Sequence, residues 1–127
     1  MGTILVIEDN EQNRYLLTFL LEQHGFTVVV AADGPRGIEL AEAVVPAAIL
    51  LDIQLPRMDG YAVARALRLR PSLQATPIVA VTSYAMPGDR EKALAAGCNG
   101  YLEKPIDPDT FVADLESAIA RMEGDRR

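Results

Sequence analysis

Hydrophobic runs of strand length alternate with helix-period segments along this chain, five times over. The runs are short and apolar throughout, which is typical of strands buried on both faces. The segments between them carry apolar residues three and four positions apart, as one face of a helix does. We expect strands at 3–8, 26–32, 47–51, 76–82 and within 98–103, and helices within 10–25, 36–45, 60–69 and 87–96 and from 107 onward.

Glycine, proline and aspartate mark the boundaries of these segments. Gly25 and Gly97 are typical stop signals after a helix. Asp107 is expected to cap the last helix, with Pro108 at its first position. The predicted inward faces are Leu16, Leu17, Leu20 and Leu21 in the first helix, Val63, Ala66 and Leu67 in the third, and Phe111, Leu115, Ile119 and Met122 in the last.

This alternation predicts an α/β fold with a parallel five-stranded sheet covered by helices on both faces. The expected architecture is the flavodoxin-like, doubly wound (βα)5 fold with strand order 2-1-3-4-5. In such folds ligands bind beyond the carboxyl ends of the strands, where the order reverses. We expect one domain over residues 1–123 and a short tail over 124–127.

Reactive side chains gather at the expected carboxyl ends of the strands. The apolar run 47–51 leads straight into a lone carboxylate, that of Asp52, and the other strand ends also carry charged or hydroxyl groups. In a parallel sheet these ends share one rim, so the side chains should lie together. They are Glu8, Asp9, Asp52, Thr82, Ser83 and Lys104.

The acids on this rim should repel one another. Glu8, Asp9 and Asp52 follow strands expected to be neighbours about 4.8 Å apart. Two like charges ~4 Å apart repel by roughly 4 kcal/mol at an effective dielectric of 20, and Lys104 alone cannot neutralise three carboxylates. The cluster should bind either protons or a cation, and its hard oxygen ligands suit Mg²⁺. Mg²⁺ beside a carboxylate nucleophile, a hydroxyl and a lysine favours phosphoryl transfer, with Asp52 as the nucleophile.

Composition narrows the function classes. The chain of 127 residues has a net charge of −6, which argues against general nucleic-acid binding. Its one cysteine, Cys98, permits no internal disulfide and is read as a small core residue. Only three residues precede the first apolar run, and no run approaches the ~20 residues of a membrane span, so we expect a cytoplasmic protein without signal peptide or membrane contact.

Four segments together resemble one family. "ILVIEDN", "LLDIQLPRMDG", "IVAVTSYAM" and "YLEKPI" occur in the order and near the spacing of the response regulator receiver domain of two-component signalling. The resemblance covers essentially the whole chain and is strongest to single-domain, DivK-like and CheY-like members. It implies that Asp52 accepts a phosphoryl group, whose oxygens Thr82 and Lys104 bind. It also implies that Tyr101 is a switch residue that follows Thr82, and that the bond before Pro105 is cis.

The resemblance also implies a metal site for Mg²⁺ (or Mn²⁺). Asp9 and Asp52 would be direct ligands, Glu8 would act through a bound water, and Gln54 would contribute its backbone carbonyl. Many members have Asp where this chain has Glu8. Gln54 and Tyr84 fall at positions that tune the dephosphorylation rate in this family, and a bulky Tyr84 is expected to hinder the attacking water.

The implied function is a phosphorylation-activated switch. A histidine kinase or histidine phosphotransfer protein would be the donor, and the chain would not be an enzyme beyond assisting its own phosphorylation and dephosphorylation. A downstream protein effector would bind the face built from the helix 87–96, the strand within 98–103 and the last helix. We expect no nucleic-acid or membrane partner, and a monomer or weak homodimer.

Other interpretations stay open at this stage. The chain could be a receiver-fold interaction module that works without phosphorylation, or the receiver portion of a hybrid histidine kinase. An aspartyl-phosphate phosphatase would carry a second acid where Gln54 stands, and a flavin carrier would need a hydroxyl- and glycine-rich phosphate loop. Taken singly, Asp52 is a common turn former, Lys104 a surface lysine and Tyr101 a packing aromatic. His24 is read as a surface residue, and the arginines at 65, 68 and 70 as a solvated helix face.

Overall fold

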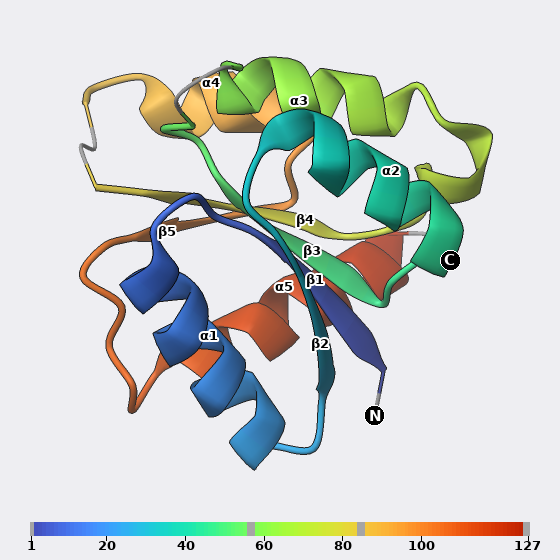
Figure 1. Ribbon diagram of the computed structural model, residues 1–127. Helices are drawn as coiled ribbons and strands as arrows, with labels where there is room; N and C mark the ends of the chain where they lie inside the picture. Colours follow the sequence, from blue (N-terminus) through green and yellow to red (C-terminus); the bar gives the residue numbers. More distant parts are fainter. Residues whose placement is uncertain (1, 56–57, 84–85, 126–127) are drawn as a thin grey trace.

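The computed structural model describes residues 2–55, 58–83 and 86–125, and it shows a sheet between two layers of helices (Figure 1). Strands and helices alternate along the chain, as the hydrophobic pattern predicts. No helix among the described residues is long and apolar enough to cross a membrane. The elements are β1 (Thr3–Ile7), α1 (Glu11–Gln23), β2 (Thr27–Ala31), α2 (Gly34–Val44), β3 (Ala48–Asp52), α3 (Gly60–Arg68), the 3₁₀-helix η1 (Pro71–Leu73), β4 (Ile78–Thr82), α4 (Asp89–Ala95), β5 (Gly100–Glu103) and α5 (Phe111–Asp125).

The sheet has five strands in the order β2-β1-β3-β4-β5, and every neighbouring pair is parallel. The register places Ile7 beside Leu51 and Asp52 beside Val81. The carboxyl ends of β1, β3 and β4 therefore meet at one rim. This confirms the predicted flavodoxin-like fold and strand order.

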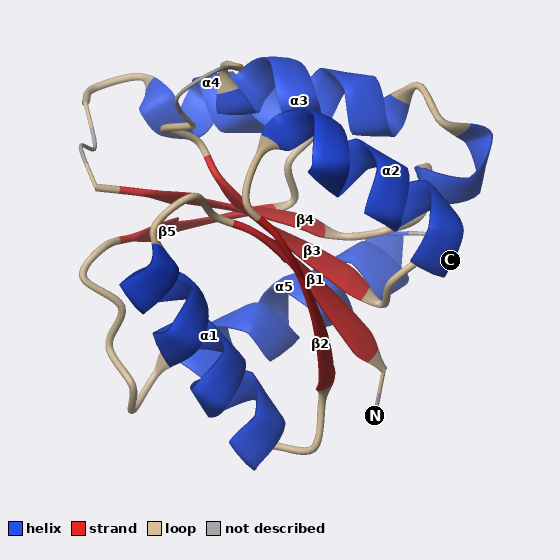
Figure 2. Ribbon diagram, in the orientation of Figure 1, coloured by secondary structure: helices blue, strands red, loops and turns tan. Residues whose placement is uncertain are grey.

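Helices α2, α3 and α4 cover one face of the sheet, and α1 and α5 cover the other (Figure 2). A hydrophobic core lies on each face of the sheet, and alternate residues of β1 contribute to each. Leu5 and Ile7 pack in the core under α2, α3 and α4, and Ile4 and Val6 pack in the core under α1 and α5. Full burial of such side chains contributes about 1.5–3 kcal/mol each. The two cores fix the strands, and so fix where the strand ends lie.

Side-chain caps begin two of the helices, and the two predicted glycines follow the ends of two helices. The Asn10 side chain accepts from the Asn13 N–H at 2.9 Å and starts α1, directly beyond the acids that follow β1. Asp33 caps α2 in the same way. Gly25 and Gly97 have φ of 89° and 107°, the left-handed conformation in which helices commonly end.

The last helix differs from its predicted bounds. The Asp107 side chain accepts from the Asp109 N–H at 2.9 Å, and its carbonyl accepts from the Phe111 N–H, so residues 107–110 form a turn before the regular helix begins. The helix then runs to Asp125 and includes the first two residues of the predicted tail, because the segment before it is rich in good helix formers. The side chain of Met122, predicted to face inward, lies outside the described residues.

The prediction of a solvated arginine face on α3 is wrong for Arg68. This half-buried guanidinium donates to the carbonyl oxygens of Gly97, Leu73 and Thr76 at 2.7–2.9 Å, and also to the Asn99 side chain. Its stem passes so close to Gly97 that a side chain there would meet it. Helical periodicity could not reveal this, because the acceptors lie on loops from elsewhere in the chain.

Candidate functional site

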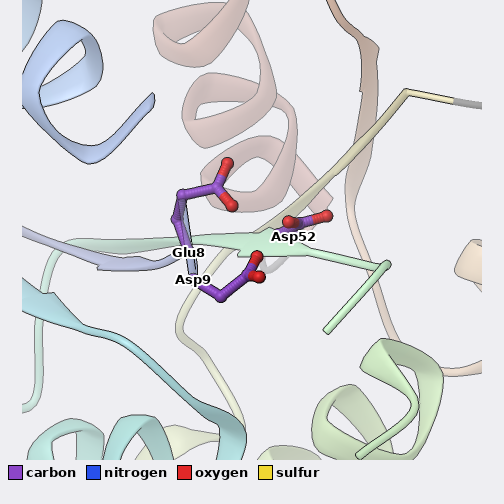
Figure 3. A group of neighbouring side chains, drawn as sticks. All are labelled: Glu8, Asp9 and Asp52. Atoms are coloured by element: carbon purple, nitrogen blue, oxygen red, sulfur yellow. The ribbon is translucent and has the colours of Figure 1, made fainter. Parts of the chain in front are cut away.

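Three acids meet at the carboxyl ends of β1 and β3. Glu8 and Asp9 follow β1, and Asp52 is the last residue of β3 (Figure 3). One carboxylate oxygen from each lies within 4.8 Å of the others. Glu8 and Asp52 are 1% and 4% exposed, whereas Asp9 is exposed. The predicted convergence of these three acids is confirmed.

Lys104, directly after β5, brings a positive charge into this cluster. Its Nζ lies 2.6 Å from Glu8 Oε1 and 3.4 Å from Asp52 Oδ2. The Lys104 N–H donates to the Thr82 carbonyl at 2.7 Å, which fixes the end of β5 against the end of β4. One lysine therefore contacts two buried acids, and the cluster retains net negative charge.

Burial and charge oppose each other in this cluster. Burial, and then the neighbouring Asp52 carboxylate, raise the pKa of Glu8 to about 7, although Lys104 acts in the other direction. Burial alone would lower the pKa of Lys104. Its hydrogen bond to Glu8 and the charges of Asp52 and Glu8 outweigh that effect and raise the pKa. Without a metal, Glu8 therefore gains and loses its proton near neutral pH.

The turn after β3 holds Asp52 in place. Its Oδ1 accepts from the Gln54 N–H at 2.9 Å, and the Ile53 N–H donates to the Val81 carbonyl at 3.0 Å. The Gly60 N–H closes the loop onto the Ile53 carbonyl at 3.0 Å. A Cβ on Gly60 would collide with the Ile53 backbone, so only glycine allows this close approach.

A side-chain contact that sequence reasoning missed joins two loops at the rim. The Gln54 Oε1 accepts from the Ser83 N–H at 2.9 Å, so the loop after β3 is tied to the loop after β4. Thr82, buried at the end of β4, lies directly before Ser83. The resemblance assigns Gln54 a metal-binding backbone carbonyl and a rate-tuning position, but it gave no signal for this contact of the side-chain amide.

Arg14 is a second residue that sequence reasoning missed. Its Nη1 donates to the carbonyl oxygens of Glu8 and Asp9, at 2.9 Å each, and so holds the backbone of the acid pair. The Asn10 N–H donates to Glu8 Oε2 at 3.3 Å. The available signal was an arginine near the start of α1, where the helix dipole disfavours positive charge and a compensating contact is expected.

The remaining predicted site residues lie along β5 and beyond it. Tyr101 pairs with Ala80 in the sheet, and its hydroxyl oxygen is buried with no hydrogen-bond partner among the described residues. Burial raises the pKa of this hydroxyl. The Lys104–Pro105 peptide bond is cis, the geometry that the resemblance implies. Tyr84 lies outside the described residues.

The donor set of the cluster fits a hard divalent cation. Its ligand atoms are carboxylate oxygens, two of them from buried residues and one from the exposed Asp9. Mg²⁺ commonly takes one or two carboxylates and keeps several waters, which the exposed side of the cluster allows. The described residues offer no histidine or cysteine at this position, so softer metals are less favoured.

Comparisons with known proteins agree with this geometry. Residues 4–116 match the family described as "Response regulator receiver domain". Among curated proteins, the polar-differentiation response regulator DivK of Brucella anthropi is 36% identical over 117 residues, covering 92% of this chain and 95% of that protein. The DivK of Brucella ovis matches equally well in identity and coverage.

Solved structures give the same result. Chemotaxis protein CheY4 of Vibrio cholerae superposes with a TM-score of 0.89 at 28% identity, covering 93% of this chain and 98% of that one. The receiver domain of sensor histidine kinase PA1611 from Pseudomonas aeruginosa, described with a magnesium ion in its active-site cleft, has a TM-score of 0.82 at 37% identity and covers 97% and 98%. This chain therefore belongs to the response regulator receiver domain family of phosphorylation-based two-component signalling.

Proposed function

We propose that this chain is a phosphorylation-activated receiver that takes a phosphoryl group onto Asp52. The observation that carries the proposal is the meeting of Glu8, Asp9 and Asp52 within 4.8 Å, with Lys104 against two of them. A structural role alone would not place two buried acids beside a third. The magnesium ion described in the related sensor-kinase receiver supports a metal at the corresponding position.

Asp9, Asp52 and the backbone carbonyl of Gln54 would hold Mg²⁺ or Mn²⁺, and Glu8 would act through a water. The ion would offset negative charge on the phosphoryl oxygens when bound. Lys104 is placed to bind one of these oxygens, since its Nζ already reaches Asp52 Oδ2 at 3.4 Å. The Thr82 hydroxyl would bind another from the end of β4. The Gln54 N–H orients the Asp52 carboxylate through Oδ1.

The transfer itself is a displacement at phosphorus. A carboxylate oxygen of Asp52 forms the new P–O bond, and the P–N bond of a donor phosphohistidine breaks. The donor imidazole leaves with the electron pair of that bond. Water later hydrolyses the aspartyl phosphate, so the chain assists its own reactions but turns over no separate substrate. The donor is a histidine kinase or a histidine phosphotransfer protein, and Gln54 and Tyr84 tune the hydrolysis rate.

The output would use the face built from α4, β5 and α5, read by a downstream protein. β5 lies at the edge of the sheet, forms part of this face and carries Tyr101. An unpaired buried hydroxyl costs about 1–3 kcal/mol, and this cost favours a second position for the Tyr101 ring. Movement of Thr82 toward the phosphoryl group would select that position.

The test is phosphorylation with a small donor, acetyl phosphate, in the presence of Mg²⁺. Intact mass should increase by one phosphoryl group, and peptide mapping should place it on Asp52. Asp52→Asn should prevent it, whereas Asp33→Asn, which keeps a capping side chain outside the site, should not. Modification at another residue, or equal modification of Asp52→Asn, would reject Asp52 as the acceptor.

A second measurement addresses the output face. Beryllofluoride with Mg²⁺ mimics the phosphoryl group, and amide NMR shifts should then change along α4, β5 and α5 in the wild type and not in Asp52→Asn. Tyr101→Ala should retain phosphorylation and lose the distant shifts. Shift changes confined to the strand ends around Asp52 would reject the proposed output face and leave Asp52 as a phosphoacceptor only.

A further inference from the structure

A groove runs between α3 and α4, away from the acidic cluster. Two adjoining hollows of about 440 and 350 Å³ share Arg65, Ala95 and Ala96 in their walls. Both helices lie on the same face of the sheet (Figure 1). We call this the α3–α4 groove. The residues that line it include Tyr61, Arg65, Leu69, Lys92, Ala95 and Ala96.

The charge of this groove is opposite to that of the whole chain. Arg65 and Lys92 are exposed on its two sides, and neither forms an ion pair within the part of the chain that the structure describes. Among the described residues that line the groove, Asp59 is the one acid, and its carboxylate already accepts from the Tyr61 N–H at 3.0 Å. In a chain of net charge −6, two cations that have no ion pair with any described residue therefore line one groove.

The groove also offers apolar contact. Leu69, directly after α3, is 78% exposed, which leaves most of this leucine in water. Ala95 and Ala96 form a wall of small side chains that lets another backbone approach closely. A small anion would pair with the two cations but leave Leu69 uncovered, so a longer partner with both acidic and apolar groups fits better.

We infer that the α3–α4 groove binds an acidic amphipathic helix of a partner protein. Leucine-like side chains of that helix would cover Leu69 and the alanines, and its carboxylates would pair with Arg65 and Lys92. Helix-in-groove binding uses apolar anchors three and four residues apart, with charged groups at the rim. The charge complementarity selects an acidic helix over a basic one.

This groove shares α4 with the proposed output face, but its described residues include none of β5 or α5, and its use requires no phosphate on Asp52. Tyr61 connects the groove to the start of α4, because its hydroxyl donates to the Asp89 carbonyl at 3.5 Å. A partner seated against Tyr61 would therefore also contact the residues that position α4.

The test uses a designed peptide and the unphosphorylated full chain. The peptide has about twelve residues, three helical turns, with leucines on one face and glutamates elsewhere. Amide NMR shifts should change in α3 and α4 at Arg65, Leu69 and Ala95. A peptide of equal composition with its leucines spread around the helix, and one with lysines for glutamates, should bind at least about tenfold more weakly.

Matched variants separate the groove from general charge. Arg65→Glu with Lys92→Glu should weaken binding at least about tenfold, while Arg36→Glu with Arg121→Glu, which make the same change in net charge elsewhere, should weaken it less than about twofold. For the apolar contact, Leu69→Ser should weaken binding and Leu94→Ser, half-exposed and outside the groove walls, should not. Far-ultraviolet circular dichroism checks that each variant folds.

Three results would overturn the inference. One is equal weakening by the two double variants, and another is a set of shifts that lies on β5 and α5. The third is a shift of the groove residues when the protein alone is concentrated, which would identify a second copy as the occupant. Asp52→Asn should bind the peptide as the wild type does, so failure of the proposed phosphorylation would leave this result unaffected.

Discussion

Glu8 carries its carboxylate at a position 1% exposed, between Asp52 and Lys104. In the unfolded chain its pKa is the ordinary 4.5, and in the fold burial raises it to about 7. Between these values the folded protein holds a proton that the unfolded chain has released. Without metal, the contribution of Glu8 to the free energy of unfolding is therefore most favourable below pH 4.5 and is lost as pH rises through 7.

This shift predicts that the free energy of unfolding of the metal-free protein falls by about 3 kcal/mol between pH 4.5 and 7.5 through Glu8. Urea unfolding in EDTA across this range measures it. Glu8→Gln, which cannot ionise, should remove most of the fall, whereas Glu11→Gln at an exposed site in α1 should keep it. An unchanged slope in Glu8→Gln would show that other groups cause the pH dependence.

Arg68 gives a second prediction for a single residue. Its guanidinium donates to acceptors in two connections at once, between α3 and β4 and between α4 and β5, and an ammonium cannot reproduce that fork of donors. Arg68→Lys should lower the free energy of unfolding by about 2–3 kcal/mol, because buried carbonyl oxygens lose their donors. Arg65→Lys, an exposed change on the same helix, should alter it by less than about 0.5 kcal/mol. Chemical denaturation compares the two, and equal effects would contradict the role given to Arg68.

The end of α2 is an element under strain. Val45 follows the helix with φ of 46°, a left-handed conformation that a β-branched residue adopts only at a cost. Its N–H still donates to the Ala41 carbonyl, so the cap is formed in spite of the residue that occupies it. Pro46 follows at once and prevents the helix from continuing.

Val45→Asn should therefore stabilise the fold by about 1 kcal/mol, because asparagine tolerates the left-handed region. Differential scanning calorimetry should show a higher midpoint temperature. Val44→Asn is the matched control: this residue lies inside α2 with similar exposure, and there asparagine should be neutral or destabilising. A gain in both variants would point to removal of exposed apolar surface rather than relief of strain.

At the scale of the whole molecule, the pattern of apolar residues predicted the fold, because strands such as β3 are buried along their full length. The meeting of Glu8, Asp9 and Asp52 followed from the sheet alone, since parallel order places those strand ends together. The contacts of Arg68 could not be predicted in this way. They depend on where loops lie in space, which hydrophobic periodicity does not encode.

Within the candidate site, too, some features follow from the strand pattern and others depend on where loops meet in space. Strand ends locate the acids, but the Gln54–Ser83 contact joins two loops, and nothing in either segment alone requires it. The turn before α5 was missed because Asp107 and Pro108 are equally suited to begin a helix or a turn. The helices and strands, and their order along the chain, can thus be predicted from local sequence patterns. The contacts that join loops depend on how the whole molecule folds.

The acidic cluster makes stability of the whole molecule depend on a cation. Three carboxylates within 4.8 Å repel one another in the fold and separate on unfolding, so an ion bound only by the folded state opposes unfolding. At a Mg²⁺ concentration ten times its dissociation constant, the gain should be about 1.4 kcal/mol. Because the cation also favours the ionised form of Glu8, the gain should be larger at pH 7.5 than at pH 5.

Urea unfolding with MgCl₂, compared with NaCl at equal ionic strength, measures this gain. Asp9→Asn should lose most of it, because the exposed acid of the cluster is then neutral while the buried pair with Lys104 remains. Asp33→Asn removes one negative charge outside the cluster and keeps a capping side chain for α2, so it should respond to Mg²⁺ as the wild type does. An equal gain in Asp9→Asn and Asp33→Asn would mean that Mg²⁺ acts on the general negative charge of the chain and not at the ends of β1 and β3.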